Sequence, residues 1–482
     1  MKPQMLVACL LACGSPAYAL GPSATDAATT VKIYLSGSSS LAPVVKAIAA
    51  DGCASGTADS YQLAGDSANV FGVSCTVAAA KGGGSAGLGG KNVFIAYNAS
   101  GGSAYGVYSI AKEVIPATNA LNSAQATLLQ RPQLANVGGG GICVAAGSVG
   151  GNPGITYNCT QTAQQYSDAG VADAEPSLFN VALNRPAAWV GQSISSAEFG
   201  KIDSAVQFQE IFGVAVSQNL YNDLQAMQVA QGRIATGGMP SLSRQAIANY
   251  LAGAFTDPAS GFGWQALFAT SPLAQPAAAS TRVNICTRAA GSGAKAAANV
   301  FFLNNPCGSG ALLPATAAQS VPGSFVVSEG VSTSAVTTCL SNANSAGQYA
   351  IGIAGKAQAL PAGMQWVAIS RVPPGRDGMK EGEYDWFTET SMQWNPTYLN
   401  SYKSLPGGVT AAQLTNYLGD FRVRSGMPNV MATYPAAAQD GVAAIDDFVD
   451  YLYNDPGNAN NKTFVSRVTK LGASCAAPQW ME

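Results

Sequence analysis

Histidine is absent from all 482 residues of the chain. Histidine is the commonest metal ligand in proteins and the usual general base near neutral pH. Its absence excludes Ser-His-Asp and Cys-His nucleophilic sites and zinc hydrolases that use histidine ligands. The sequence also contains no C-x-x-C pair, so we expect neither a zinc ribbon nor a thioredoxin-like redox centre, and no metal or cofactor.

Charged residues are scarce. They make up 10% of the chain, the net charge is −2, and lysine and arginine form no cluster. Proteins that bind nucleic acid or an anionic membrane surface carry a basic patch, so we expect neither partner. Long apolar runs are missing as well, since the run from Met5 to Ala12 is far shorter than the ~20 residues that span a membrane as a helix.

The N-terminal residues have the pattern of a secretory signal. Lys2 precedes the short apolar run, and Ala17-Tyr18-Ala19 forms a small-residue cleavage site. We therefore expect cleavage after Ala19 and a periplasmic or secreted protein. The segment ending at Cys13 also resembles a bacterial lipoprotein box, so lipid anchoring through Cys13 is the alternative.

Eight cysteines follow this signal, and an even number in an exported protein indicates structural disulfides. Pairing between neighbours along the chain predicts four bonds: Cys53–Cys75, Cys143–Cys159, Cys286–Cys307 and Cys339–Cys475.

The order of patterned segments predicts an α/β fold. Residues 31–37 are typical of a buried strand, and residues 40–52 have apolar side chains at helical spacing. The strand-then-helix pattern recurs at 93–110 and again at 281–302. Residues 115–170 are weakly patterned and predict an insertion with a hairpin closed by Cys143 and Cys159. An amphipathic helix is predicted at 443–455.

The stretch at 283–302 has the pattern of an anion site. Arg288 ends a predicted strand, and Gly291-Ser292-Gly293 opens an alanine-rich helix. A helix N-terminus offers unpaired N–H groups and a partial positive charge, and glycines let an anion approach the backbone. Ser292 can cap the helix and donate its hydroxyl, while Arg288 can donate two parallel hydrogen bonds. An ordinary helix cap beside a surface arginine is the alternative.

Several short motifs resemble those of the periplasmic phosphate-binding proteins of ABC transporters. The segment "RAAGSGA" at 288–294 is similar to the family's R-x-D-G-S-G-T, and "LSGSSSLAP" at 35–43 is similar to its opening turn. Further matches in the same order fall at 97–110, 170–177 and 349–353.

This resemblance implies an α/β fold of two-lobe, Venus-flytrap architecture, in which each lobe is a central sheet flanked by helices. Lobe 1 would comprise residues 20–205 and 385–482, and lobe 2 residues 206–384, with hinges near 205–210 and 384–394. It implies a monomeric solute-binding protein, not an enzyme, that takes up phosphate or a similar oxyanion for an ABC permease. The residues expected to bind the ligand are Ser39, Ser40, Leu41, Ser103, Asp173, Arg288, Ser292 and Gly293.

The chemistry of these residues suits an oxyanion. Amides, hydroxyls and an arginine can replace water around it, and an ionised Asp173 can only accept hydrogen bonds. Asp173 would therefore favour monohydrogen phosphate over sulfate. The chain departs from the family where Ala294 replaces a threonine, so a relaxed oxyanion site stays open. The alternative function is a secreted surface or matrix interaction protein with a degenerate anion site.

Overall fold

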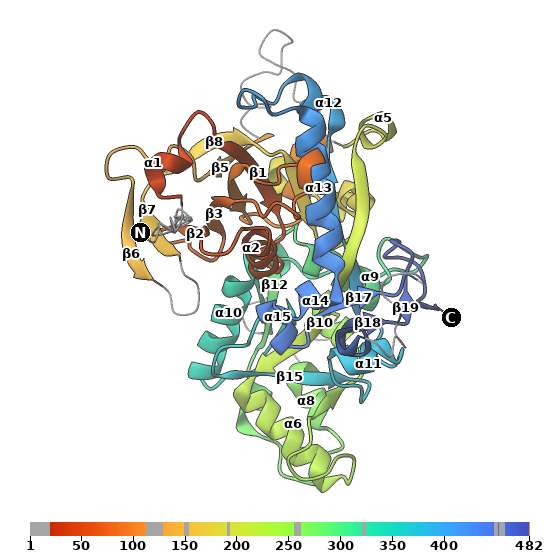
Figure 1. The fold of residues 1–482 in the computed structure, drawn as a ribbon. Helices are drawn as coiled ribbons and strands as arrows, with labels where there is room; N and C mark the ends of the chain where they lie inside the picture. The colour runs from red at the N-terminus through yellow and green to blue at the C-terminus, as the bar shows by residue number, and fades with distance from the viewer. Residues whose placement is uncertain are drawn as a thin grey trace, which may run out of the picture.

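The computed structural model describes residues 20–111, 129–148, 154–189, 193–254, 262–320, 324–447, 452 and 458–481. In these ranges the chain has a mixed α/β fold, with helices packed on a large mixed sheet (Figure 1). The predicted signal, with Cys13 and Ala19, lies outside them. None of the helices in the described ranges is both long enough and apolar enough to cross a membrane.

The described strands join into one sixteen-stranded sheet with two small additional sheets. Its main path runs β13-β12-β14-β10-β16-β9-β1-β4-β3-β2-β7-β6. The strands on this path are β1 (Val31–Gly37), β2 (Asp59–Leu63), β3 (Val70–Thr76), β4 (Asn92–Asn98), β6 (Cys143–Ser148), β7 (Ile155–Cys159), β9 (Ala169–Ala172), β10 (Asp203–Ser217), β12 (Val283–Arg288), β13 (Phe325–Gly330), β14 (Ala350–Gly355) and β16 (Phe387–Trp394). Four more strands attach beside it: β11 (Ser241–Leu242), β15 (Met364–Ile369), β17 (Val442–Ile445) and β18 (Val465–Ser466).

The strands β1 to β9, together with helices from residues 396–438, form one half of the molecule, called the first half below. It is built around β1, which lies parallel to β4 and to β9. The helices of this half are α1 (Pro22–Thr25), α2 (Ala42–Asp51), α3 (Ala104–Ala111), α12 (Pro396–Ser401), α13 (Ala411–Gly426), α14 (Pro428–Met431) and α15 (Pro435–Ala438). The apolar side chains of α2, including Val44, Val45 and Ile48, are buried in one core with those of β1, β4 and α13. The predicted strand at 31–37 and helix at 40–52 are therefore confirmed.

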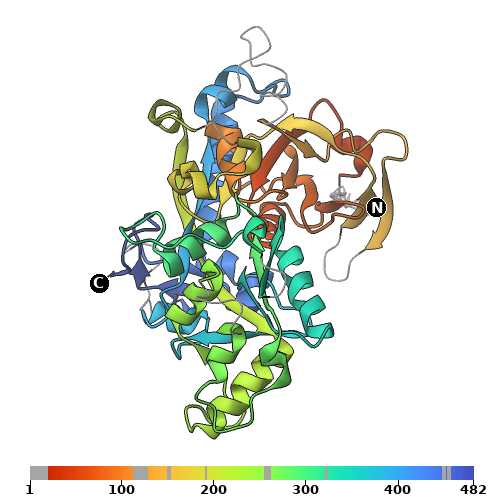
Figure 2. The ribbon, with the colours of Figure 1, turned by 180° about the vertical axis from the view of Figure 1, so that it is seen from behind.

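The second half is built around β12, which lies between β13 and β14 and is parallel to both. Its helices are α6 (Gln218–Ala230), α7 (Arg244–Ala252), α8 (Phe262–Phe268), α9 (Gly293–Leu303), α10 (Thr333–Ser345) and α11 (Arg376–Lys380). A second large core joins the strands to α6, α7 and α9. Figure 2 shows the two halves from behind, with the second half below the first.

Strands β10 and β16 join the two halves. The first part of β10 pairs with β16, and its last residues pair with β14 and β15 in the second half. The pairing of β10 with β16 shifts by one residue, because Gln207 and Phe208 together lie opposite Thr390. The hinges predicted near 205–210 and 384–394 fall on this pair of strands.

The insertion predicted at 115–170 is described in part. Its β6 and β7 form an antiparallel hairpin in which Cys143 is paired with Cys159 by both register and disulfide, as predicted. Strand β7 also extends the main sheet by pairing in parallel with β2. Two short strands, β5 (Gln130–Gln133) and β8 (Ala163–Tyr166), form a separate pair. Residues 112–128 and 149–153 lie outside the described ranges.

Two of the four predicted disulfides are wrong. Cys53–Cys75 is present as predicted, but Cys286 bonds to Cys339 and Cys307 bonds to Cys475. Cys286 lies on β12, against which α10 packs, and Cys339 lies on that helix. The packing of a helix on a strand therefore decides this pairing, and distance along the chain does not.

The helix predicted at 443–455 is wrong at its start. Residues Val442–Ile445 form strand β17, which pairs with β10 on one side and β18 on the other. Residues 442–444 are fully buried, so sheet packing overrides the helical spacing of the sequence. Phe448, which the prediction placed on the same helix, lies outside the described ranges. The C-terminal part adds α16 (Ala459–Phe464) and a small sheet of β19 (Val468–Thr469) and β20 (Gln479–Trp480).

Candidate functional site

The first predicted ligand-binding turn lies between β1 and α2. Gly37 has a φ of 141°, and a Cβ at this position would lie 1.8 Å from the carbonyl oxygen of Val171, so the turn needs glycine. Ser38 Oγ accepts hydrogen bonds from the backbone N–H groups of Ser40 (3.2 Å) and Leu41 (3.3 Å). The turn is therefore fixed by its own serine, and Ser39 and Ser40 are both buried.

The carboxylate of Asp173, just after β9, meets this turn. Its Oδ1 accepts a hydrogen bond of 3.1 Å from Ser40 Oγ. The second predicted turn lies between β4 and α3 and contains Ser103. The backbone N–H of Asp173 donates a hydrogen bond of 3.2 Å to Ser103 Oγ. Asp173 is 2% exposed. It therefore links the first two turns in the interior.

Glycines allow the second turn to contact the third predicted turn, which lies between β12 and α9. A Cβ on Gly102 would lie 2.9 Å from the carbonyl oxygen of Gly291, and a Cβ on Gly293 would lie 2.4 Å from Cβ of Asp173. The N–H of Ala104, at the start of α3, donates to the carbonyl of Gly291 at 2.9 Å. Ser292 caps α9 by accepting a hydrogen bond of 3.4 Å from the N–H of Lys295, as predicted from its position.

Arg288 lies at the end of β12 and is 3% exposed. Its guanidinium donates to Ser39 Oγ and to Thr333 Oγ1, both at 3.1 Å. It also donates to the carbonyls of Gly330 (3.3 Å) and Val331 (3.1 Å). Burial lowers the pKa of Arg288 to about 10, although Asp173 and Glu210 act in the opposite direction, so the side chain is a cation at neutral pH.

All eight residues predicted from the sequence lie in these three turns or directly beside them, and all are buried. The first two turns and Asp173 belong to the first half of the molecule, while Arg288 and the third turn belong to the second. The hydrogen bond between Arg288 and Ser39 crosses from one half to the other. Ser100, which lies in the same turn as Ser103, is not part of this cluster, and its Oγ lies 3.5 Å from Oδ2 of Asp66.

The sequence did not predict a second carboxyl group in this cluster. Glu210, on β10, is fully buried, and its Oε2 lies 3.2 Å from Ser40 Oγ. Its Oε1 has no hydrogen-bond partner among the described residues. The sequence signal was a charged residue in the middle of the apolar stretch "FQEIFGVAV", where an unpaired charge is costly to bury.

Burial raises the pKa of Glu210 well above its ordinary value, and the neighbouring carboxylate of Asp173 raises it further. Burial also raises the pKa of Asp173, but hydrogen bonds from Ser38 and the charge of Arg288 oppose this shift. The cluster thus holds one buried cation and two buried carboxyl groups with different environments.

No protein-family model and no curated protein matches the chain. Solved structures that match include a Clostridium perfringens protein named as a phosphate ABC transporter substrate-binding protein with bound phosphate. It is 11% identical, with a TM-score of 0.42, over 86% of this chain and 100% of that one. PstS from Borrelia burgdorferi is 10% identical, with a TM-score of 0.34, over 86% and 99%. An ABC-type phosphate transport receptor from Vibrio cholerae is 12% identical, with a TM-score of 0.31, over 56% and 79%.

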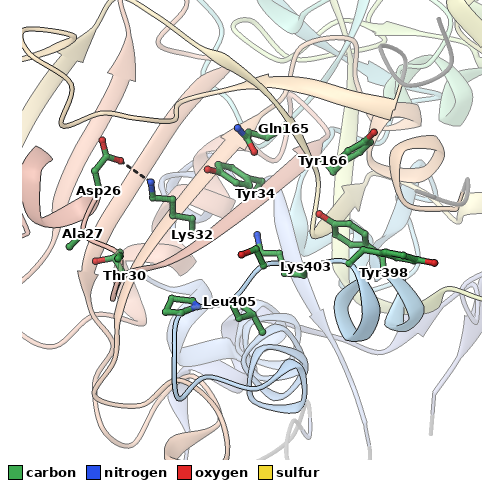
Figure 3. Close-up of a pocket in the computed structure, with 14 residues that line it drawn as sticks. Asp26, Ala27, Thr30, Lys32, Tyr34, Gln165, Tyr166, Tyr398, Lys403 and Leu405 are labelled. Atoms are coloured by element: carbon green, nitrogen blue, oxygen red, sulfur yellow. Dashed lines mark hydrogen bonds and ion pairs between the residues drawn. The ribbon is translucent and has the colours of Figure 1, made fainter. Parts of the chain in front are cut away.

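A separate cavity of about 440 Å³ lies in the first half of the molecule. Figure 3 shows Tyr34, Tyr166 and Tyr398 around it, with Lys403 between Tyr34 and Tyr398. Lys403 Nζ is 2.6 Å from Oδ2 of Asp168, and both side chains are almost fully buried. This ion pair holds the loop after α12 against β1, because Asp168 also accepts a hydrogen bond from the N–H of Tyr34.

Replacing Lys403 with methionine is expected to lower the free energy of unfolding by about 3–5 kcal/mol, because the substitution leaves the buried Asp168 carboxylate without its cation. The matched control is Lys32→Met in the same cavity wall, where the pair with Asp26 is 3.0 Å long and partly exposed and the expected loss is about 1 kcal/mol or less. Urea unfolding measures both. Equal losses in the two variants would show that the buried pair has no special weight.

Proposed function

We propose that the chain is an exported solute-binding protein that binds phosphate, or a similar tetrahedral oxyanion, where its three glycine- and serine-rich turns meet. The observation that carries the proposal is the buried position of Arg288 beside Asp173, with contributions from both halves of the molecule. A buried guanidinium surrounded by hydroxyl and backbone donors suits an anion that has lost its water.

The ligand would take up donors that now bond within the protein. Arg288 donates to Ser39, and Ser40 donates to Asp173. An oxyanion between them would accept from Arg288 and from both hydroxyls. It would also approach the N-terminus of α9, where Ser292 and Gly293 begin the helix. Leu41 and Ser103 support this arrangement through the first and second turns.

We also propose that the two halves act as lobes that close on the ligand. Residues 20–205 and 385–482 would form lobe 1 and residues 206–384 lobe 2, with β10 and β16 as the crossover. A ligand that contacts both lobes favours the closed state over the open one. In this proposal an ABC permease receives the ligand, and the leader ending at Ala19 directs export.

The test is isothermal titration of the mature protein, freed of bound ligand by mild unfolding and refolding, with phosphate and with sulfate at about pH 8. Tighter binding of phosphate is expected, because Asp173 would accept a hydrogen bond from the P–OH group that monohydrogen phosphate has and sulfate lacks. Asp173→Asn is expected to reduce the phosphate-to-sulfate preference by about 5- to 150-fold, equivalent to about 1–3 kcal/mol.

The control for this variant is Asp203→Asn, which changes an aspartate on β10 whose side chain is 43% exposed and pairs with Arg422. It is expected to leave both affinities unchanged. If the wild-type protein binds neither anion, the proposal is wrong, and an exported interaction protein with a degenerate anion site becomes the better explanation.

A further inference from the structure

The side chain of Glu210 is built into the proposed anion site. It comes from β10, which crosses between the halves, and it is fully buried. A Cβ at position 355 would lie 2.4 Å from Oε1 of Glu210, so glycine at this end of β14 leaves the space that the carboxyl group fills. The fold therefore places Glu210 against the first turn through contacts that a larger residue at 355 would prevent.

One hydroxyl serves two carboxyl groups here. Ser40 Oγ lies 3.1 Å from Oδ1 of Asp173 and 3.2 Å from Oε2 of Glu210, and a hydroxyl has a single proton to donate. Oε1 of Glu210 receives no hydrogen bond from a donor in the described part of the chain. Hydrogen bonding between the side chains of Glu210 and Asp173 raises the pKa of Glu210. Two ionised carboxylates in this dry space would repel each other and would outnumber the one cation, Arg288.

The groups that face Glu210 show which carboxyl group takes the proton. Asp173 has the larger set of donors, from Ser38, Ser40 and Ser103, and the charge of Arg288 favours its ionised form. For Glu210, Ser40 and the charge of Arg288 favour the ionised form, while the charge of Asp173 and the hydrogen bond with its side chain favour the protonated form. Tyr97, a further titratable group beside the pair, donates its hydroxyl to the carbonyl of Ser38, and burial raises its pKa well above its ordinary value. The strands next to Glu210 in the sheet, β16 and β17, present Thr388 and Val442 opposite it.

Resting on the function proposed above, we propose that Glu210 is a neutral carboxylic acid in this protein, that it donates a hydrogen bond to the bound oxyanion, and that it makes affinity for the anion dependent on pH. Asp173 would accept a hydrogen bond from the P–OH group of monohydrogen phosphate, while the carboxyl O–H of Glu210 donates a hydrogen bond to another oxygen of the ligand. Buried carboxyl groups in apolar sites can stay protonated at neutral pH and act as donors in this way. Without this proton the site would hold two negative charges against one positive charge and would repel a dianion.

The test compares the wild-type protein with Glu210→Gln and Glu210→Leu by titration with inorganic phosphate between about pH 7.5 and pH 9.5. Wild-type affinity is expected to fall about tenfold per pH unit once Glu210 ionises. Glutamine keeps an uncharged donor, so Glu210→Gln is expected to bind with nearly constant affinity over the same range. Leucine has no donor, and Glu210→Leu is expected to bind more weakly than glutamine at every pH. Any fall that the glutamine variant shares with the wild type has a source other than Glu210.

A second measurement does not depend on binding. The infrared spectrum of the ligand-free wild-type protein at about pH 7.5 is expected to contain a protonated-carboxyl band that Glu210→Gln lacks. If that band is absent, or if both proteins bind phosphate with the same pH dependence, Glu210 is not the proposed acid, and the binding function itself stands. If neither protein binds phosphate at any pH, the proposed function fails and the role of Glu210 in ligand binding fails with it.

Discussion

Replacing Arg288 with methionine is expected to weaken phosphate binding by about 30- to 5,000-fold, which corresponds to about 2–5 kcal/mol. The guanidinium is the only cation among the residues predicted to bind the ligand, and it is 3% exposed, so solvent cannot replace it. Titration calorimetry at about pH 8 measures the loss. Arg288→Lys keeps the charge but has no planar fork, and is expected to bind with intermediate affinity.

The control for Arg288 is Arg282→Met, six residues earlier, immediately before the same strand. Arg282 is exposed and its Nε donates to the side chain of Asn284, so its loss is expected to leave phosphate affinity unchanged. Because Arg288→Met also leaves Thr333 and two carbonyl groups without their donor, urea unfolding should first show that the variant is folded at the titration temperature. Undiminished phosphate binding by a folded Arg288→Met protein would place the anion elsewhere.

Removing the disulfide between Cys307 and Cys475 with a pair of serines is expected to lower the free energy of unfolding by about 5 kcal/mol. The bond closes a loop with a sequence separation of 168 residues, so it restricts the unfolded chain more than any other bond in the described structure. The matched control removes Cys143–Cys159, whose separation of 16 residues predicts a loss of about 3 kcal/mol. Denaturant unfolding under non-reducing conditions compares the two, and a larger loss for the short loop would contradict loop entropy as the main cause.

The features that could be predicted from the sequence are those set by neighbouring residues. The turn at 37–41 requires glycine at its start and is held by its own Ser38, and Ser292 caps the helix that it precedes. Local rules of this kind also located the strand at 31–37 and the hairpin at Cys143–Cys159. Arg288 was found from its place before a glycine-rich helix start and Asp173 through motif resemblance, and the fold explains why residues so far apart in sequence can meet.

The features that the sequence left open depend on contacts between distant segments. Cys286 could be assigned to Cys339 only once α10 was seen to pack on β12. The spacing of Ile445, Phe448 and Leu452 fits a helix, but residues 442–445 form a strand between β10 and β18. Glu210 lacked any motif of its own. Its importance comes from Ser40, in the turn between β1 and α2, and from Asp173, just after β9.

The extra residue in β10 determines which way Glu210 faces. Side chains alternate between the two faces of a strand, and Gln207 with Phe208 opposite Thr390 shifts that alternation by one step before Glu210 is reached. Loss of a single residue at this point would turn Glu210 away from Ser40 and bring an apolar or amide neighbour to the proposed anion site instead. In the proposed site, the number of residues in this part of β10 therefore matters as much as their identity. If the proposal holds, a homologue that is shorter by one residue here should bind the anion with a different dependence on pH.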